Sequence, residues 1–238
     1  MALLVTGAMG QVGYEVARQA SADGAGVVAQ YRRTFDEPAA RALGDAVRWF
    51  PCDLVDIAAI ETLADDHAID ACIHLAAVSN EAYARPDPVA AVQSNALAVA
   101  NLLDVARRKH WRRVIVASTG GVFQNLNDVT RPIFEDTTPT ATNIYGTTKL
   151  CAELLTRMYR TQFDVSAAVV RISWVYGPPT VITDATRGPI PVFLAKALAG
   201  TPVRDPGGAD FAASFTYVAD VAAGLIAACR APALNFDL

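Results

Sequence analysis

The sequence predicts an α/β protein built on a doubly wound parallel sheet, with a small lobe toward the C-terminus. Two observations carry this prediction. Short apolar runs alternate with longer amphipathic runs along most of the chain, which is the order expected of parallel strands joined by helical crossovers. The short runs are rich in Val, Ile and Ala, as in strands that helices cover on both faces.

This pattern predicts six strands and six helices. The expected strands are Ala2–Val5, Val27–Tyr31, Val47–Phe50, Ala71–His74, Arg113–Ala117 and Ala167–Arg171. The expected helices are Val12–Ala22, Ile57–Ala64, Pro88–Lys109, Tyr145–Gln162, Val192–Gly200 and Asp220–Cys229.

The composition changes after Arg171, because Ser173–Ala213 is rich in Pro, Gly, Thr and Asp. Such a stretch is typical of a surface lobe or of substrate loops at strand ends. We therefore expect residues 1–172 to form a dinucleotide-binding domain. Residues 173–238 are expected to form mostly a substrate-binding lobe, with a helix near 220–229 that returns to the core.

Composition limits the class of protein. The 238 residues are 53% hydrophobic and 18% charged, with a mean hydropathy of +0.26, which excludes a disordered chain. The pI of about 5.3 argues against nucleic acid as a partner. The basic run Arg107–Arg113 is expected at a helix C-terminus, where cations complement the dipole. We expect no metal site, since the cysteines lack a ligand-like spacing; they are Cys52, Cys72, Cys151 and Cys229.

The start of the chain carries no recognisable targeting signal. Leu3–Val5 leads directly into Thr6 and Gly7, which leaves too short an apolar stretch for a signal peptide. No apolar run in the sequence approaches the ~20 residues that a membrane span needs. We expect a cytoplasmic protein that does not contact a membrane.

A glycine-rich turn lies between the first strand and the first helix. It reads Thr6-Gly7-Ala8-Met9-Gly10-Gln11-Val12-Gly13. Glycines at this spacing allow a tight turn, a close approach to a pyrophosphate and close packing of helix on strand. The helix N-terminus then offers unpaired N–H groups to phosphate. Strand before and helix after favour a Rossmann-like dinucleotide site over an ordinary turn.

The end of the second strand bears on the choice of cofactor. An acid there would bind both ribose hydroxyls and select NAD, but Gln30-Tyr31-Arg32-Arg33 offers none. Arg32 and Arg33 are placed to bind a 2′-phosphate, which favours NADP within a general expectation of NAD(P). The alternative is that both are ordinary surface arginines.

Two side chains near the start of a later helix suggest proton transfer. Tyr145 and Lys149 are four residues apart and so share one helix face. A nearby ammonium favours the phenolate, and we expect it to lower the Tyr145 pKa from its usual value near ~10. Thr119 follows the strand Arg113–Ala117, at the edge where open α/β sheets bind ligands. It could contact the same substrate oxygen as Tyr145.

Taken in order, these motifs resemble the extended short-chain dehydrogenase/reductase family, the NAD-dependent epimerase/dehydratase group. The motifs are T-G-x-x-G-x-x-G, H-x-A-A, S-T-x-x-V-[YF], Y-x-x-x-K and R-x-x-x-V-Y-G-P. They read here Thr6–Gly13, His74–Ala77, Ser118–Phe123, Tyr145–Lys149 and Arg171–Pro178, with a further likeness at Tyr217–Val221. The resemblance extends from Leu3 to about Ala228.

The resemblance implies roles for individual residues. Tyr145 would be the acid/base, Thr119 would polarise the substrate oxygen, and Lys149 would bind the nicotinamide ribose. Asp53 would meet the adenine amino group, and His74 would be structural rather than a base. The other positions expected at the cofactor are Gly7, Met9, Gly10, Gln11, Val12, Gly13, Arg32, Arg33, Leu54, Leu75, Ala76, Ala77 and Asn95. The substrate is expected at Ser79, Thr119, Gln124, Tyr145 and Tyr176, with Asn143, Arg187 and Arg204 as further polar candidates.

Three reactions share this apparatus. Family dehydratases carry Asp-Glu after the threonine, whereas this chain has Gly120 and Gly121, which disfavours dehydration. Net oxidation or reduction of a hydroxyl or carbonyl carbon in a sugar-like substrate is the main prediction, and epimerisation through a transient ketone is the alternative. A regulatory NAD(P)-binding protein is a further, non-enzymatic alternative.

The resemblance also bears on size and assembly. Family members continue beyond the segment that Leu234–Asp237 resembles, so the chain is expected to be either a compact member or an incomplete one. Relatives often form homodimers through helices equivalent to Pro88–Lys109 and Tyr145–Gln162. Residues that would supply apolar surface there, unless they face the sheet, are Ala96, Ala100, Leu103, Ala152, Leu155 and Met158.

Overall fold

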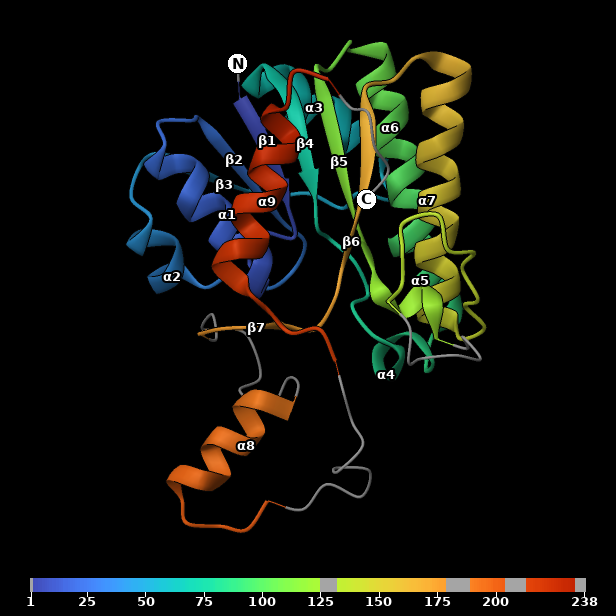
Figure 1. The fold of residues 1–238 in the computed structure, drawn as a ribbon. Helices are drawn as coiled ribbons and strands as arrows, with labels where there is room; N and C mark the ends of the chain where they lie inside the picture. Colours follow the sequence, from blue (N-terminus) through green and yellow to red (C-terminus); the bar gives the residue numbers. More distant parts are fainter. Residues whose placement is uncertain (1, 125–131, 179–188, 204–212, 234–238) are drawn as a thin grey trace.

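The computed structural model describes residues 2–124, 132–178, 189–203 and 213–233. Its centre is a six-stranded parallel sheet in the order β3-β2-β1-β4-β5-β6 (Figure 1). This is the strand order of a Rossmann-type doubly wound sheet, which confirms the predicted fold class. The strands are β1 (Ala2–Thr6), β2 (Val27–Tyr31), β3 (Val47–Pro51), β4 (Ile69–His74), β5 (Arg113–Thr119) and β6 (Ala167–Ile172).

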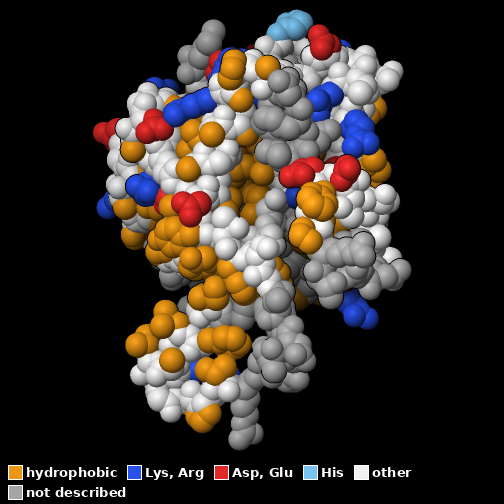
Figure 2. All heavy atoms as spheres, viewed as in Figure 1, with side chains coloured by type: hydrophobic (Ala, Val, Ile, Leu, Met, Phe, Trp, Pro, Cys, Tyr) orange, Lys and Arg blue, Asp and Glu red, His pale blue; other side chains and the backbone are white. Residues whose placement is uncertain are grey.

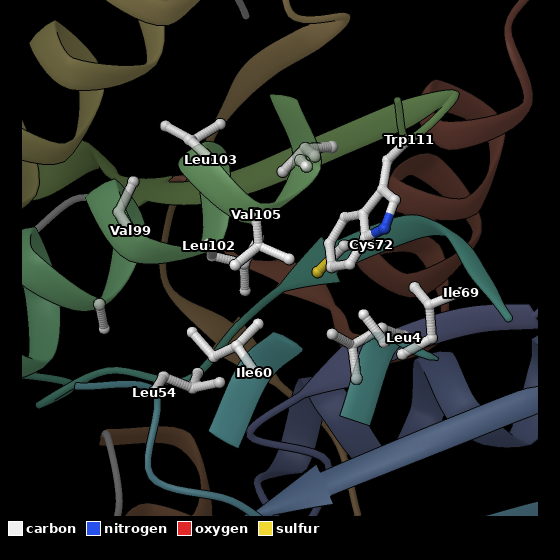
Figure 3. Close-up of a cluster of buried hydrophobic side chains, with 14 of the residues drawn as sticks. Leu4, Leu54, Ile60, Ile69, Cys72, Val99, Leu102, Leu103, Val105 and Trp111 are labelled. Carbon is white, nitrogen blue, oxygen red and sulfur yellow. The ribbon is translucent and has the colours of Figure 1, made fainter. Parts of the chain in front are cut away.

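Helices cover both faces of the sheet, because each strand buries side chains on both sides. Helices α1 (Gln11–Ala22) and α9 (Val218–Arg230) pack together on one face. The other face is covered by α3 (Ile57–His67), α6 (Ala98–Arg108) and α7 (Ile144–Phe163). Figure 3 shows part of this second core, where Leu102 and Val105 of α6 face Ile60 of α3.

The helix predicted at Pro88–Lys109 is interrupted in its hydrogen-bond pattern. It consists of α5 (Pro88–Val92), a π-helical turn η1 (Gln93–Leu97) and α6. The helical segment Pro88–Arg108 has the length and the apolar composition that a membrane-spanning helix would need. Since α6 contributes Val99, Leu102 and Leu103 to the core against the sheet, we interpret this composition as that of a core helix.

Several short elements were not predicted from the sequence. They are α2 (Glu37–Ala42), α4 (Glu81–Ala84), the 3-10 turn η2 (Gly120–Phe123), and the strand pair β7 (Val175–Tyr176) and β8 (Thr216–Tyr217). The first two helices are too short for a hydrophobic period to reveal them. Their N-caps could have done so, because Asp36 accepts from the Ala39 N–H and Asn80 from the Tyr83 N–H.

Helix α8 (Pro189–Leu198) begins and ends before the predicted Val192–Gly200. Proline is tolerated in the first helical turn, so Pro189 and Pro191 do not prevent the earlier start. Gly200 has a φ of +64°, which lies outside the helix. Figure 1 shows α8 set apart from the body of the protein, and Figure 2 shows apolar side chains over its surface. Leu194 and Leu198 of this helix are exposed.

The basic run at the end of α6 is largely neutralised by acids. Arg107 and Arg108 both pair with Asp104, and Arg108 also pairs with Glu61 of α3. Lys109 pairs with Asp65, and Arg112, which lies just before β5, pairs with Asp70. These contacts support the interpretation of the run as a helix end and not a nucleic-acid patch.

Candidate active site

The glycine turn after β1 brings three backbone segments into contact. Gly7 has a φ of +62°, and a Cβ on it would lie 2.8 Å from the backbone of Ala76, which follows β4. A Cβ on Gly13 would lie 2.4 Å from the carbonyl oxygen of Gly7. Glycine is therefore required at both positions by space, as predicted for a helix that packs closely on its strand.

The N-terminus of α1 is open to an anion. Gly10 is its N-cap, no side chain caps the helix, and its first turn contains no acidic residue. The predicted Gln11 lies here, but its side chain donates to the carbonyl oxygens of Gly177 and Pro178 at 3.2 and 3.3 Å. The other predicted members of the turn have apolar surroundings, since Met9 is buried and Val12 packs against the core.

Thr6 joins the ends of β1 and β4, the two strands between which the order of the sheet reverses. Its hydroxyl oxygen accepts from the N–H groups of Leu75 and Ala76 at 2.9 and 3.1 Å. The same oxygen lies 2.9 Å from Nδ1 of His74, to which the hydroxyl must therefore donate. Burial lowers the pKa of His74 to about 3. This geometry favours the structural interpretation of His74, which would be neutral at ordinary pH.

Gln30 was missed as a site residue, although it is the one amide in the apolar strand β2. Its side chain is 2% exposed and bridges two strand ends. Oε1 accepts from the Gly7 N–H at 2.9 Å, and Nε2 donates to the Cys52 carbonyl oxygen at 2.5 Å. A buried polar side chain in such a strand is the sequence signal that could have found it.

The residues expected around the adenosine lie at the ends of β2 and β3. Arg32 and Arg33 are exposed, and neither guanidinium has a hydrogen-bond or ion-pair partner within the described ranges. Asp53 is exposed, and its carboxylate accepts from the Val55 N–H at 3.1 Å. Leu54 is buried in the core below it. The two arginines are thus available to a ligand. Their exposure agrees both with a site for a 2′-phosphate and with ordinary surface arginines.

The structure brings Thr119 and Tyr145 together. Their side chains are hydrogen-bonded to each other, and Thr119 also accepts from the Gly121 N–H at 3.0 Å. Gly146 permits this approach, because a Cβ there would lie 2.9 Å from the carbonyl oxygen of Gly121. The N–H of Tyr145 donates to Glu81 of α4 at 2.9 Å, a contact that the sequence analysis did not anticipate.

The electrostatics of the pair differ from the prediction. Burial raises the pKa of Tyr145, and the hydrogen bond with Thr119 opposes that rise. The expectation that Lys149 lowers the Tyr145 pKa is wrong, since Lys149 is not among the groups that shift it. Burial lowers the pKa of Lys149 itself to about 8, and Glu153 opposes this change. Lys149 is therefore expected to be mostly charged at neutral pH and to lose its proton at a pH well below that of an ordinary lysine.

Asn95 lies in the π-helical turn η1 and is fully buried. Its amide exchanges hydrogen bonds with the backbone of Val78 at 2.8 and 3.1 Å and donates to the Thr148 hydroxyl at 3.0 Å. The Thr148 hydroxyl in turn donates to the Tyr145 carbonyl oxygen at 2.9 Å. Asn95 thus fixes the loop after β4 against the start of α7, and π turns of this kind are frequent at functional sites.

The other residues predicted to contact the substrate do not join the Thr119–Tyr145 pair in the described structure. Ser79 and Gln124 are exposed, and Tyr176 of β7 packs its ring 5.5 Å from that of Tyr217. Asn143 instead caps α7, because its side-chain oxygen accepts from the Gly146 N–H at 2.7 Å. Ala77 is half-buried. Arg187 and Arg204 lie outside the described residues.

Together, these features define a Rossmann-type protein with a glycine-rich turn at its switch point and the candidate residues Thr119, Tyr145 and Lys149 at the same edge of the sheet. The family model described as the NAD dependent epimerase/dehydratase family matches residues 3–236. The chain belongs to this family.

Individual relatives carry out related reactions. A dTDP-4-dehydro-6-deoxy-D-allose reductase from a Streptomyces species is 33% identical over 229 residues, which are 92% of this chain and 69% of that protein. A UDP-glucuronate 4-epimerase from Thermodesulfobacterium geofontis is 28% identical, over 77% of this chain and 55% of its own length. The chain therefore spans little more than half the length of that epimerase.

A solved structure gives the same fold. The UDP-glucose 4-epimerase of Thermus thermophilus in complex with NAD superimposes with a TM-score of 0.83 at 25% identity. The match covers 97% of this chain and 75% of that one.

The glycine contacts generate a stability prediction. We expect Gly13→Ala to destabilise the protein by about 1–3 kcal/mol, because its Cβ would press on the Gly7 carbonyl oxygen. Gly224→Ala is the matched control, since it lies inside α9 with no atom within 4 Å of the new Cβ, and it should stabilise by about 0.5–1 kcal/mol. Urea unfolding of both variants measures the difference, and equal stabilities would contradict the packing argument.

Proposed function

We propose that this protein is an NAD(P)-dependent oxidoreductase that acts on a hydroxyl or carbonyl carbon of a sugar-like substrate. The observation that carries the proposal is the Thr119–Tyr145 pair, with the buried Lys149 one helical turn after Tyr145, at the sheet edge that also holds the glycine turn. The chain is also 33% identical to a dTDP-4-dehydro-6-deoxy-D-allose reductase, and this similarity supports the same reaction type.

The residues present fit a dinucleotide. The uncapped N-terminus of α1 supplies N–H groups and a positive dipole end for a pyrophosphate. No side chain projects from Gly7, Gly10 or Gly13, so the backbone can approach the phosphates. Asp53 would meet the adenine amino group and Lys149 the nicotinamide ribose.

The chemistry divides between cofactor and protein. A bound nicotinamide would supply or accept hydride at the substrate carbon. In the reducing direction, the Tyr145 hydroxyl donates its proton to the substrate carbonyl oxygen, and in the oxidising direction it takes the proton of the substrate hydroxyl. The Thr119 hydroxyl hydrogen-bonds to the same oxygen and orients it. Because burial raises the Tyr145 pKa, the acid form is favoured, which suits reduction.

Epimerisation is the second candidate, and it is favoured by the likeness to NAD-bound UDP-glucose 4-epimerase. The two reactions differ in whether the cofactor is changed overall. Net oxidation or reduction of the substrate changes the absorbance of the nicotinamide at 340 nm in proportion to the product formed. Epimerisation yields the product isomer with no net change in this absorbance. The turn η2 holds Gly120 and Gly121 where dehydratases carry acids, so dehydration is not proposed.

Replacement of Tyr145 tests the acid/base role. We expect Tyr145→Phe to lower kcat by about 100- to 10,000-fold while the Kd for NADPH stays the same, because the ring remains and only the proton donor is lost. Tyr159→Phe is the control, since this tyrosine lies at the far end of α7 against Phe163. An undiminished kcat in Tyr145→Phe would overturn the assignment of Tyr145 as the acid/base.

Arg32 and Arg33 would give a preference for NADP over NAD. We expect the Arg32→Ala and Arg33→Ala double variant to raise the Kd for NADP roughly tenfold or more, since charge-assisted hydrogen bonds to the 2′-phosphate are lost. The Kd for NAD should hardly change. Arg48→Ala, an exposed arginine of β3, is the control in the same fluorescence titration. An unchanged Kd for NADP would make the two arginines plain surface residues, and equal losses for both nucleotides would contradict a contact with the 2′-phosphate.

A homodimer is proposed through the helices α5–α6 and α7. The structure changes which residues could form it, because Ala96, Leu103 and Ala152 are buried in the protein's own core. Ala100 and Leu155 are half-buried, which leaves Met158 as the exposed member of the predicted set. Other exposed apolar side chains on these helices are Val89, Val92, Leu97 and Leu154.

We expect Leu154→Glu to shift the protein from dimer to monomer, because a carboxylate would be buried at the contact. Leu198→Glu on α8 introduces the same charge at an exposed apolar position elsewhere and should leave the dimer intact. Sedimentation velocity measures both, and a monomeric parent protein would contradict the proposal outright.

A further inference from the structure

A buried carboxylate lies directly behind the candidate catalytic groups, and the proposed reaction does not use it. Glu153 is on α7, one helical turn after Lys149, and is 8% exposed. A carboxylate is costly to bury unless it is paired and hydrogen-bonded. Its contacts therefore indicate what it does in the fold.

Both oxygens of Glu153 are engaged by the strands below α7. Oε1 accepts from the Ser118 hydroxyl at 2.5 Å and from Nε of Arg171 at 3.0 Å. Oε2 accepts from Nη2 of Arg171 at 2.7 Å. Ser118 and Arg171 are direct partners in the register of β5 and β6. Since Ser118 precedes Thr119, the carboxylate fixes α7 to the strand end that carries the threonine.

The arginine extends this network to the turn that follows Thr119. The Arg171 guanidinium lies over the ring of Phe123, with its carbon 4.9 Å from the ring centroid. Phe123 is buried in η2, the turn that Thr119 begins. Glu153 and Arg171 thus contact the elements on both sides of the threonine.

The same carboxylate acts on Lys149 along the helix. Residues four apart on a helix are neighbours, and Glu153 is the group that opposes the burial-induced fall in the Lys149 pKa. The other charged or titratable groups along this part of α7 are His74 of β4, which interacts with Lys149, and Tyr145, one turn before it. Glu81 of α4 contacts Tyr145, and Arg171 of β6 contacts Glu153. His74 would be neutral, and Glu81 accepts from the Tyr145 backbone, which leaves Glu153 as the balancing anion among these groups.

We propose that Glu153 is a positioning residue that holds the Lys149 ammonium charged beside Tyr145, with Arg171 moderating its charge and Ser118 fixing its place. The consequence for turnover rests on the proposed function. The positioning itself is a property of the protein alone, so it can be measured without substrate or cofactor.

The sequence offers a direct measurement, because it contains only three lysines, Lys109, Lys149 and Lys196. Lysine labelled with carbon-13 at Cε gives one NMR signal for each, and Lys149→Arg assigns the signal of interest. In the parent protein, Lys149 should titrate at about pH 8. Lys109 and Lys196 serve as internal controls, since one pairs with Asp65 and the other lies on α8.

We expect Glu153→Gln to lower the Lys149 midpoint by about one pH unit or more, because an opposite charge at this range has been removed. Arg171→Gln should raise the midpoint, because the carboxylate then acts on Lys149 without its cation. Ser118→Ala keeps both charges and should leave the midpoint unchanged. Opposite shifts in the first two variants support the proposal. Shifts in the same direction, or no shift in Glu153→Gln, overturn it.

Either single variant leaves a buried ion without its partner, and that cost alone is large enough to destabilise the fold. The double variant Glu153→Gln with Arg171→Met removes both ions, and its Lys149 midpoint then decides. A lower midpoint than in the parent supports the proposal, and an equal or higher one overturns it. A protein without turnover that still shows these shifts would contradict the proposed function and leave this inference standing.

Discussion

The close approach of three backbone segments at Gly7 is the constraint on which the rest of the site depends. A turn this tight brings the end of β1 against the segment after β4 and against the first turn of α1. Thr6 and Gln30 then complete the hydrogen bonds of the strand ends that meet there. Because no side chain occupies this junction, backbone N–H groups and a helix N-terminus face the crevice where a Rossmann sheet binds its ligand.

Much of this architecture could be predicted from the sequence, because strong periodicity reports the core directly. The six strands of the main sheet agree with the predicted ones to within two residues at either end, since each is an apolar run bounded by polar residues. The glycine spacing and the four-residue step from Tyr145 to Lys149 located both parts of the site. Short helices such as α2 and α4 escaped, because four to six residues carry no measurable period.

What the sequence could not supply was the contact between distant segments. The hydrogen bond of Glu81 to the start of α7, and the pairing of Glu153 with Ser118 and Arg171, join residues far apart in the chain. The predicted direction of the Tyr145 pKa shift was wrong for a related reason. Helical spacing shows that a charge is near, but burial decides whether the charged form is tolerated, and burial depends on the whole fold.

The amide of Gln30 has a consequence for how a nucleotide could bind. It ties the glycine turn to the end of β3 within the folded chain itself, so the turn is already rigid when a ligand arrives. The conformational entropy of ordering this loop is then lost during folding and not at each encounter. A preformed loop of this kind lets a phosphate-bearing ligand bind with little rearrangement of the backbone.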